Sequence, residues 1–234
     1  MGAIGLGLFF SSAATGWADD VPPAIKPASH MELFNGKDFS GWTFFMKDNA
    51  DPAQTWSIEH GVIKCTGKPL GYMRTQQDFR DYRISVEWRF VRIAPHADNT
   101  GVFVHIQLPD KIWPRCVECQ GQYGRQGDLR LQAGVGAKDH PSQETKGVGV
   151  PMVGPSNEKP VGEWNTCEAV CTGSTIRNII NGKQMNEITG CSISSGKIGL
   201  QSEGGNIEIR RVFLDPLPPE SSQDMPKSKS PPSP

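Results

Sequence analysis

The chain has 234 residues, of which 26 are Gly, 19 are Pro and only 8% are aromatic. Gly and Pro destabilise helix interiors. Together they form about a fifth of this chain, against roughly 12% in average proteins, which excludes a helical bundle or coiled coil. The 24 Lys and Arg nearly balance the 25 Asp and Glu, which argues against nucleic-acid binding through bulk positive charge. These values indicate a loop-rich domain of β-strands.

The N-terminal residues are predicted to be an export signal. Residues 1–18 begin with an uncharged apolar run and end in Gly16-Trp17-Ala18, which resembles a signal sequence with its cleavage site. No Lys or Arg precedes the run, so a disordered apolar tail is the alternative. The run is too short to span a bilayer. We therefore expect an exported protein, periplasmic or extracellular, without a membrane span.

The rest of the chain divides by composition. Its last residues are rich in Pro, Ser and Lys and lack the apolar side chains that would offset the entropy of ordering them. We expect a signal sequence over 1–18, a linker over 19–30, one folded domain over 31–217 and a disordered tail over 218–234.

The folded part is predicted to consist of short strands. Residues 82–90 alternate strictly between apolar and polar side chains, which predicts a strand with one buried face. Asn181-Gly182 is the strongest short signal for a hairpin turn, and His60-Gly61 is a second turn candidate. Many short strands separated by turns favour a sandwich or jelly roll. Further strands are predicted at 55–66, 101–107, 115–120, 165–172, 175–180, 183–188, 197–203 and 207–214.

A long glycine-rich segment, residues 121–162, interrupts this pattern. Loops of such length inside a domain are usually functional or disordered. Because strong strands flank the segment, we expect it to form binding loops folded over one face of the sandwich.

The six cysteines do not have the spacing of a metal site. Cys116 and Cys119 point to opposite faces if they lie on one strand. Cys167 and Cys171 would share a face but lie about 13 Å apart. Export would expose the thiols to an oxidising compartment, yet Cys packs readily in cores. We therefore favour buried free thiols over one or two disulfides, and we reject a zinc site.

Polar side chains are predicted to gather on one sheet face. Alternation places His105 away from the valines of 101–107, and it places Glu118 and Gln120 on one face of 115–120. If these strands pair, a base, an acid and an amide converge. A solvated outer face is the alternative. The nearby aromatic Trp113 favours a sugar site, and Trp164 is a second stacking candidate.

The order of short motifs resembles a known family. Residues 33–42, Leu-Phe-Asn-Gly-Lys-Asp-Phe-Ser-Gly-Trp, are similar to the opening of the 3-keto-disaccharide hydrolase domain family. The resemblance covers 31–217, nearly the whole predicted domain. Further family motifs follow in the family's order at 99–103, 117–120, 162–165 and 198–201.

This resemblance implies a fold and an activity. The family has a concanavalin-like β-sandwich, an all-β jelly roll. It cleaves glycosides whose sugar carries a ketone at C3, which implies a small carbohydrate substrate and a functional link to a sugar 3-dehydrogenase. The ketone acidifies the C2 proton, so a base can form an enediolate, the C1 leaving group departs, and water adds.

Candidate roles follow from the face and the resemblance together. We expect Glu118 and His105 to be the acid/base pair, and the remaining candidates to bind substrate. Whether a divalent metal assists is left open, since His and carboxylate groups could hold one. The predicted substrate-binding residues are Gln120, Asn99, Trp113, Trp164, Gln201 and Glu203.

Two other functions remain as alternatives. One is a non-catalytic, lectin-like carbohydrate-binding module of the same fold. The other is an ordinary glycosidase, which needs two carboxylates beside one site, and Glu203 is the second candidate next to Glu118. The chain departs from the family pattern at two positions, with His105 where many relatives carry Arg and Glu203 where many carry His.

Overall fold

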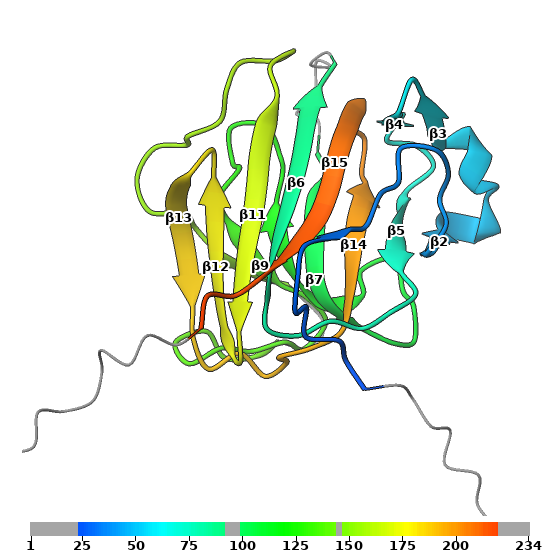
Figure 1. The fold of residues 1–234 in the computed structure, drawn as a ribbon. Helices are drawn as coiled ribbons and strands as arrows, with labels where there is room; N and C mark the ends of the chain where they lie inside the picture. The colour runs from blue at the N-terminus through cyan, green and yellow to red at the C-terminus, as the bar shows by residue number, and fades with distance from the viewer. Residues whose placement is uncertain (1–22, 92–98, 144–146, 220–234) are drawn as a thin grey trace, which may run out of the picture.

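Two antiparallel sheets pack face to face in a β-sandwich (Figure 1). The computed structural model describes residues 23–91, 99–143 and 147–219. The predicted signal sequence over 1–18, and most of the predicted tail, lie outside the described residues and stay predictions. The fold is all β, and each sheet contributes one face to a shared core.

The sheet nearer the viewer in Figure 1, called here the front sheet, has the order β13-β12-β11-β6-β15-β4-β3, with β1 beside β15. Its longest strands, β6 and β15, lie side by side near the middle. The strands are β1 Met31–Glu32, β3 Trp56–Glu59, β4 Val62–Cys65, β6 Tyr82–Phe90, β11 Asn165–Thr172, β12 Thr175–Ile180, β13 Lys183–Ile188 and β15 Ile207–Pro216.

The second sheet, called the back sheet, has the order β10-β9-β8-β7-β14-β5-β2. Two short 3₁₀ turns, η1 (Lys47–Asn49) and η2 (Pro52–Gln54), follow β2. No helix among the described residues is long and apolar enough to cross a bilayer. The strands are β2 Trp42–Met46, β5 Gly71–Thr75, β7 Gly101–Gln107, β8 Arg115–Gln120, β9 Leu129–Leu131, β10 Val148–Val150 and β14 Lys197–Ser202.

Both predicted hairpin turns are present. His60 and Gly61 have φ of 52° and 76°, and Asn181 and Gly182 have φ of 49° and 80°. Two successive residues with positive φ give the turn whose twist matches the flanking strands. The first turn divides the predicted strand over 55–66 into β3 and β4.

The glycine-rich segment over 121–162 is not only a loop, as its composition had suggested. It contributes β9, which pairs with β8, and β10, which pairs with β9. Each has only three residues, too few for an alternating pattern to be distinguished from irregular chain. The segment therefore extends the back sheet by two strands beyond the strongly patterned ones.

Apolar side chains from the inner faces of both sheets fill the space between them. The alternating face of β6, including Ile84 and Val86, packs there with Val102, Val104 and Val117 from the back sheet. All six cysteines are buried and free, which confirms the prediction of buried thiols. The core therefore fixes which side chains of each strand point outward.

A β-bulge near the end of β7 reverses this alternation. The register of β7 with β8 shifts between Val104 and Gln107, and His105 has φ of 58°, which turns its side chain toward the other face. Ile106 then packs outward beside Phe103. The His105 ring points inward, 5.7 Å from the ring of Tyr82 on the front sheet.

Candidate functional site

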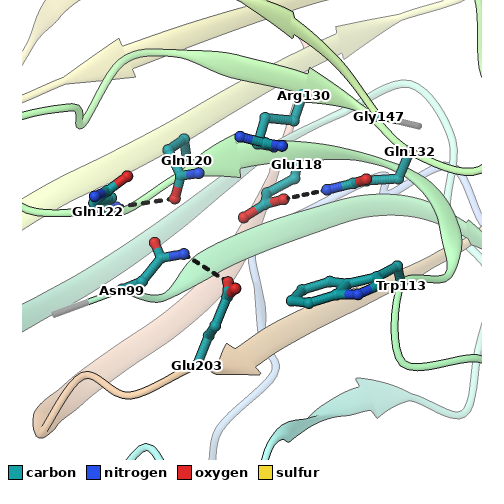
Figure 2. A pocket seen from close by; sticks show the side chains of 9 residues that line it. All are labelled: Asn99, Trp113, Glu118, Gln120, Gln122, Arg130, Gln132, Gly147 and Glu203. Carbon is teal, nitrogen blue, oxygen red and sulfur yellow. Dashed lines mark hydrogen bonds between the residues drawn. The ribbon is translucent and has the colours of Figure 1, made fainter. Parts of the chain in front are cut away.

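A pocket of about 290 Å³ lies on the outer face of the back sheet. Figure 2 shows Trp113 at one end and Asn99 and Gln122 at the other, with the carboxylates of Glu118 and Glu203 directed into the space between. The lining residues are Asn99, Trp113, Glu118, Gln120, Gln122, Arg130, Gln132, Gly147 and Glu203.

Strand alternation explains the upper wall of the pocket. On β8, Glu118 and Gln120 alternate with residues of the core, so both point outward. On β9, Arg130 lies between two core leucines. It is directly opposite Glu118 in the register of β8 with β9. Gln132 follows β9 on the same outward side, so a carboxylate, a guanidinium and two amides converge on one patch.

A glycine opens the floor of the pocket. A Cβ added to Gly101 would lie 2.7 Å from Glu118 Oε1 and 3.2 Å from Gln201 Oε1. The missing side chain therefore lets the Glu118 carboxylate and the Gln201 amide approach the strand from its two sides. Gln201 borders the pocket from β14, and both of its polar side-chain atoms are buried without a hydrogen-bond partner.

Glu118 is an almost fully buried carboxylate, with 1% of its surface exposed. Its Oε2 accepts a 2.8 Å hydrogen bond from Gln132 Nε2, and its Oε1 has no partner. Burial raises the pKa of Glu118 to about 7, and the Glu203 charge adds to the rise, although Gln132 and Arg130 act against it. Glu118 can therefore take up or release a proton near neutral pH.

Glu203 is the second carboxylate of the pocket. Asn99 Nδ2 donates a 2.6 Å hydrogen bond to its Oε2, and a backbone bridge between the same two residues holds them together. Burial raises the pKa of Glu203 above its ordinary value, against the effects of Arg130 and Gln201. Asn99 Oδ1 remains buried without a partner.

Unpartnered polar atoms mark this pocket as a place for a hydroxyl-rich ligand. Buried donors and acceptors are nearly always satisfied in folded proteins. Here Glu118 Oε1 and Asn99 Oδ1, on two residues that line the pocket, and the Gln201 amide beside Gly101 have no partner among the described residues. Trp113, with 42% of its surface exposed, supplies an apolar ring at one end. Hydroxyl groups and an apolar sugar face would match these features.

The structure brings most of the predicted site residues together. Five of them line the pocket: Asn99, Trp113, Glu118, Gln120 and Glu203. Gln201 borders it at Gly101. Gln120 is held by the backbone N–H of Gln122, which donates a 3.0 Å hydrogen bond to its Oε1.

The prediction that His105 shares the face of Glu118 is wrong. The bulge in β7 turns His105 into the core, where neither ring nitrogen has a partner. Burial lowers the pKa of His105 to about 4, so the ring is neutral at neutral pH. It is a core residue and not part of the pocket.

Trp164 is also absent from the pocket. It lies on the front sheet, where the guanidinium groups of Arg89 and Arg210 stack on its ring at 4.6 and 4.4 Å from the centroid. Trp164 directly precedes β11, and alternation alone does not indicate which sheet that strand joins.

Sequence reasoning missed the residues that the glycine-rich segment contributes. Arg130 comes from β9 and Gln132 directly follows it, while Gln122 and Gly147 come from the neighbouring parts of the segment. The pattern Leu129-Arg130-Leu131-Gln132 alternates, but it is too short to identify a strand by itself. A Cβ at Gly147 would lie 2.5 Å from Gln132 Oε1, so this position leaves room for the amide.

The possible metal has few candidate ligands here. Within the ranges that the structure describes, no three His, Cys, Asp or Glu side chains lie close enough to share an ion. The pocket offers the carboxylates of Glu118 and Glu203, with Arg130 beside them. The histidine expected in a ligand set, His105, faces the core.

Comparison with known proteins identifies the family. The sequence model of the 3-keto-alpha-glucoside-1,2-lyase-like domain matches residues 29–215. The chain belongs to this family. A 3-keto-disaccharide hydrolase of Bacteroides thetaiotaomicron is 24% identical over 174 residues, which cover 68% of this chain and 58% of that protein. This chain thus spans little more than half the length of that relative.

Solved structures confirm the predicted fold. A candidate glycosyl hydrolase of Parabacteroides distasonis has a TM-score of 0.57 at 19% identity, covering 80% of this chain and 99% of its own. A β-glucanase of Bacillus licheniformis has a TM-score of 0.54 at 12% identity, covering 81% and 97%. The chain is therefore a concanavalin-like jelly roll of a carbohydrate-hydrolase-like family.

Proposed function

We propose that this protein cleaves the glycosidic bond of a sugar that carries a ketone at C3. One observation carries the proposal. Glu118 has a pKa of about 7 and a free oxygen, and it lies in one pocket with a second carboxylate and an arginine. Family membership supplies the class of substrate.

The first half of the reaction is a proton abstraction. The C3 ketone makes the C2–H bond acidic, and Glu118 Oε1 is a base whose pKa matches neutral conditions. The electron pair moves to form a C2–C3 double bond, with the negative charge on the C3 oxygen. The Arg130 guanidinium, which lines the same pocket, stabilises this charge.

The second half releases the leaving group and adds water. The C3 oxyanion re-forms the ketone, and the C2–C3 electron pair becomes a C1=C2 bond as the C1–O bond breaks. Glu203, whose raised pKa favours its protonated form, donates its proton to the departing glycosidic oxygen. It then accepts a proton from water, which attacks C1, while Glu118 returns its proton to C2. Atoms balance as net hydrolysis, and Glu203 takes the acid/base role that the sequence had suggested for His105.

The cellular setting of the reaction follows from its substrate. A ketone at C3 has to be made by oxidation of the sugar, so a sugar 3-dehydrogenase is the expected partner enzyme. The apolar N-terminal run over 1–18 supports export to the periplasm or the exterior, where small saccharides are available. Detection of the protein in the periplasmic or secreted fraction, and not in the cytoplasm, tests this location.

The test is turnover of 3-keto-sucrose or 3-keto-trehalose by the purified protein, with and without EDTA. We expect Glu118→Gln to lower kcat/KM at least about 100-fold. Glu87→Gln, which removes a carboxylate from the front sheet, is the matched control and keeps full activity. If the wild type shows no turnover but binds sugar through Trp113, the protein is a binding module and the proposal fails.

An ordinary glycosidase is the second candidate, because two carboxylates line one pocket. Reaction in heavy water distinguishes the two chemistries. Elimination breaks the C2–H bond, and the proton held on Glu118 exchanges with solvent when water enters, so the product carries deuterium at C2. Direct displacement at C1 leaves C2 untouched. Cleavage of the unoxidised disaccharide without deuterium at C2 would favour the glycosidase.

A further inference from the structure

The loop between β7 and β8 carries the aromatic end of the pocket. It runs from Leu108 to Pro114, and Trp113 lies near its end. Pro109 and Pro114 restrict the backbone on both sides of Trp113. The indole is one of the few large apolar side chains exposed among the described residues, and it extends into the pocket in Figure 2.

A carboxylate three residues before Trp113 anchors this loop. Arg74 Nε donates a 2.7 Å hydrogen bond to Asp110 Oδ1, and Arg74 Nη2 donates a 2.7 Å bond to Oδ2. The Tyr72 hydroxyl donates a 2.8 Å bond to Oδ1. The side chains of Arg74 and Asp110 are only 11% and 20% exposed, so this is a shielded, two-pronged ion pair.

The residues that anchor the loop are not on the two strands that the loop connects. β7 and β8 are neighbours, but Tyr72 and Arg74 lie on β5, which is separated from β7 by β14. The loop therefore crosses the outer face of the back sheet to reach β5. Adjacent antiparallel strands are usually joined by two to five residues without such an anchor, so connecting β7 to β8 does not account for it.

The anchor is ionised at working pH. Burial alone would raise the pKa of Asp110, but the hydrogen bonds from Arg74 and Tyr72 hold it below its ordinary value. Tyr72 of the anchor is itself a member of a second buried cluster, separate from the main core, which consists of Tyr72, Phe103, Ile106 and Cys116. The ion pair of Asp110 and the buried position of Tyr72 together hold the loop in one position.

We propose that Asp110, held by Arg74 and Tyr72, is a positioning residue that fixes the Trp113 indole as a preformed stacking wall for the sugar. A preformed wall lowers the entropy lost on binding. The inference rests on the proposed function for its substrate, but the position of Trp113 can be tested without any substrate.

The first test follows Trp113 itself. Protein labelled with 5-fluorotryptophan is studied by ¹⁹F NMR, and Trp113→Phe assigns the resonance. We expect Asp110→Asn to shift or broaden the Trp113 signal and to leave the other tryptophan signals unchanged. The matched control is Asp78→Asn, which removes the partner of Lys197 in another ion pair of the back sheet. An unchanged Trp113 signal in Asp110→Asn overturns the proposal.

The second test is a double-mutant cycle on 3-keto-sucrose. We expect Asp110→Asn to raise KM about tenfold with kcat nearly unchanged, because it loosens a binding wall and not the base. In a Trp113→Ala background the same substitution should have no further effect. An equal effect in both backgrounds, or a loss confined to kcat, overturns the proposal.

The two tests separate the proposal from the assignment of the reaction. If the wild type shows no turnover, the NMR test still decides whether Asp110 fixes Trp113. If Asp110→Asn does not fold, Tyr72→Phe removes one of the three hydrogen bonds and is subjected to both tests. We expect the same changes from it at smaller size, and an unmoved Trp113 signal would again overturn the proposal.

Discussion

The outer faces of the two sheets carry similar charged residues in opposite arrangements. On the front sheet, Arg83 and Glu168 lie 2.8 Å apart, and Arg210 and Glu87 lie 2.5 Å apart. On the back sheet, the Glu118 carboxylate is buried and the Glu203 carboxylate is half-buried. Each has an amide partner, and in the described part of the chain neither makes an ion pair. The front sheet pairs these charges, whereas the pocket on the back sheet leaves two carboxylates available beside the satisfied Arg74–Asp110 pair.

This difference distinguishes charged groups that pair with each other on the surface from charged groups that can act on a ligand. Exposed ion pairs contribute about 0–1 kcal/mol each, whereas an unpaired buried carboxylate destabilises the fold. The same contrast holds for two tryptophans. Trp164 lies between two guanidinium groups of the front sheet, while Trp113 is exposed at the pocket. Unpartnered polar atoms also occur in the core, for example at His105. The candidate site is therefore marked by an unpaired carboxylate and an exposed indole that line one pocket.

The strongest way to test this contrast is to neutralise Glu118. Its pKa rises from 4.5 to about 7 on folding, so the native state holds a proton that the unfolded state has lost between these pH values. The contribution of Glu118 to the free energy of unfolding is therefore fully present below pH 4.5 and is lost as the pH rises through 7. We expect Glu118→Gln to raise the free energy of unfolding at pH 8 by about 3 kcal/mol.

Urea denaturation at pH 5 and pH 8 measures this effect. The difference between Glu118→Gln and wild type should be larger at pH 8 than at pH 5. The control, Glu87→Gln, removes a paired carboxylate and should show no gain at either pH. A loss of stability at pH 8 in Glu118→Gln would show that the carboxylate is satisfied after all.

A smaller effect is expected at Arg130. Its charge lowers the pKa of Glu118 and stabilises the proposed enolate. Arg130→Met should therefore move the acidic limb of the kcat/KM profile to higher pH and lower kcat/KM at pH 7 about tenfold. Arg210→Met, on the front sheet, is the matched control with an unchanged profile. A uniform loss with no movement of the limb would contradict the link to Glu118.

The smallest effect is expected on the front sheet. Arg210 pairs with Glu87 and stacks on Trp164, and its side chain is half exposed. Arg210→Met should lower the free energy of unfolding by less than about 1 kcal/mol, since both contacts are screened by water. Denaturation at low and high salt measures this. A loss above about 2 kcal/mol would mean that this face contributes more than paired surface charges.

Alternation in the sequence was sufficient to predict most strands and half of the pocket. Glu118 and Gln120 were predicted because their strand alternates regularly, and Asn99 was predicted from the family motif over 99–103. Trp113 was identified as an aromatic between two such strands. These positions depend only on local pattern and on pairing between neighbouring strands, which the sequence expresses directly.

The rest depended on contacts that no local pattern encodes. Residues 101–107 alternate without a flaw, so nothing in the sequence marks the bulge that turns His105 inward; its conformation is set by packing between the sheets. Trp164 was misplaced because alternation does not say which sheet a strand joins. Arg130 was missed because a three-residue strand gives too few alternations to be recognised within a glycine-rich segment.

Because Gly101 has no side chain, it determines where the Glu118 carboxylate can lie. The residue lies in an ordinary strand, and an added methyl group would meet Glu118 Oε1 at 2.7 Å. Gly101→Ala would therefore displace the carboxylate while leaving its charge and its Gln132 partner in the chain. A substitution at this one position would therefore change where the Glu118 carboxylate lies without changing the glutamate itself.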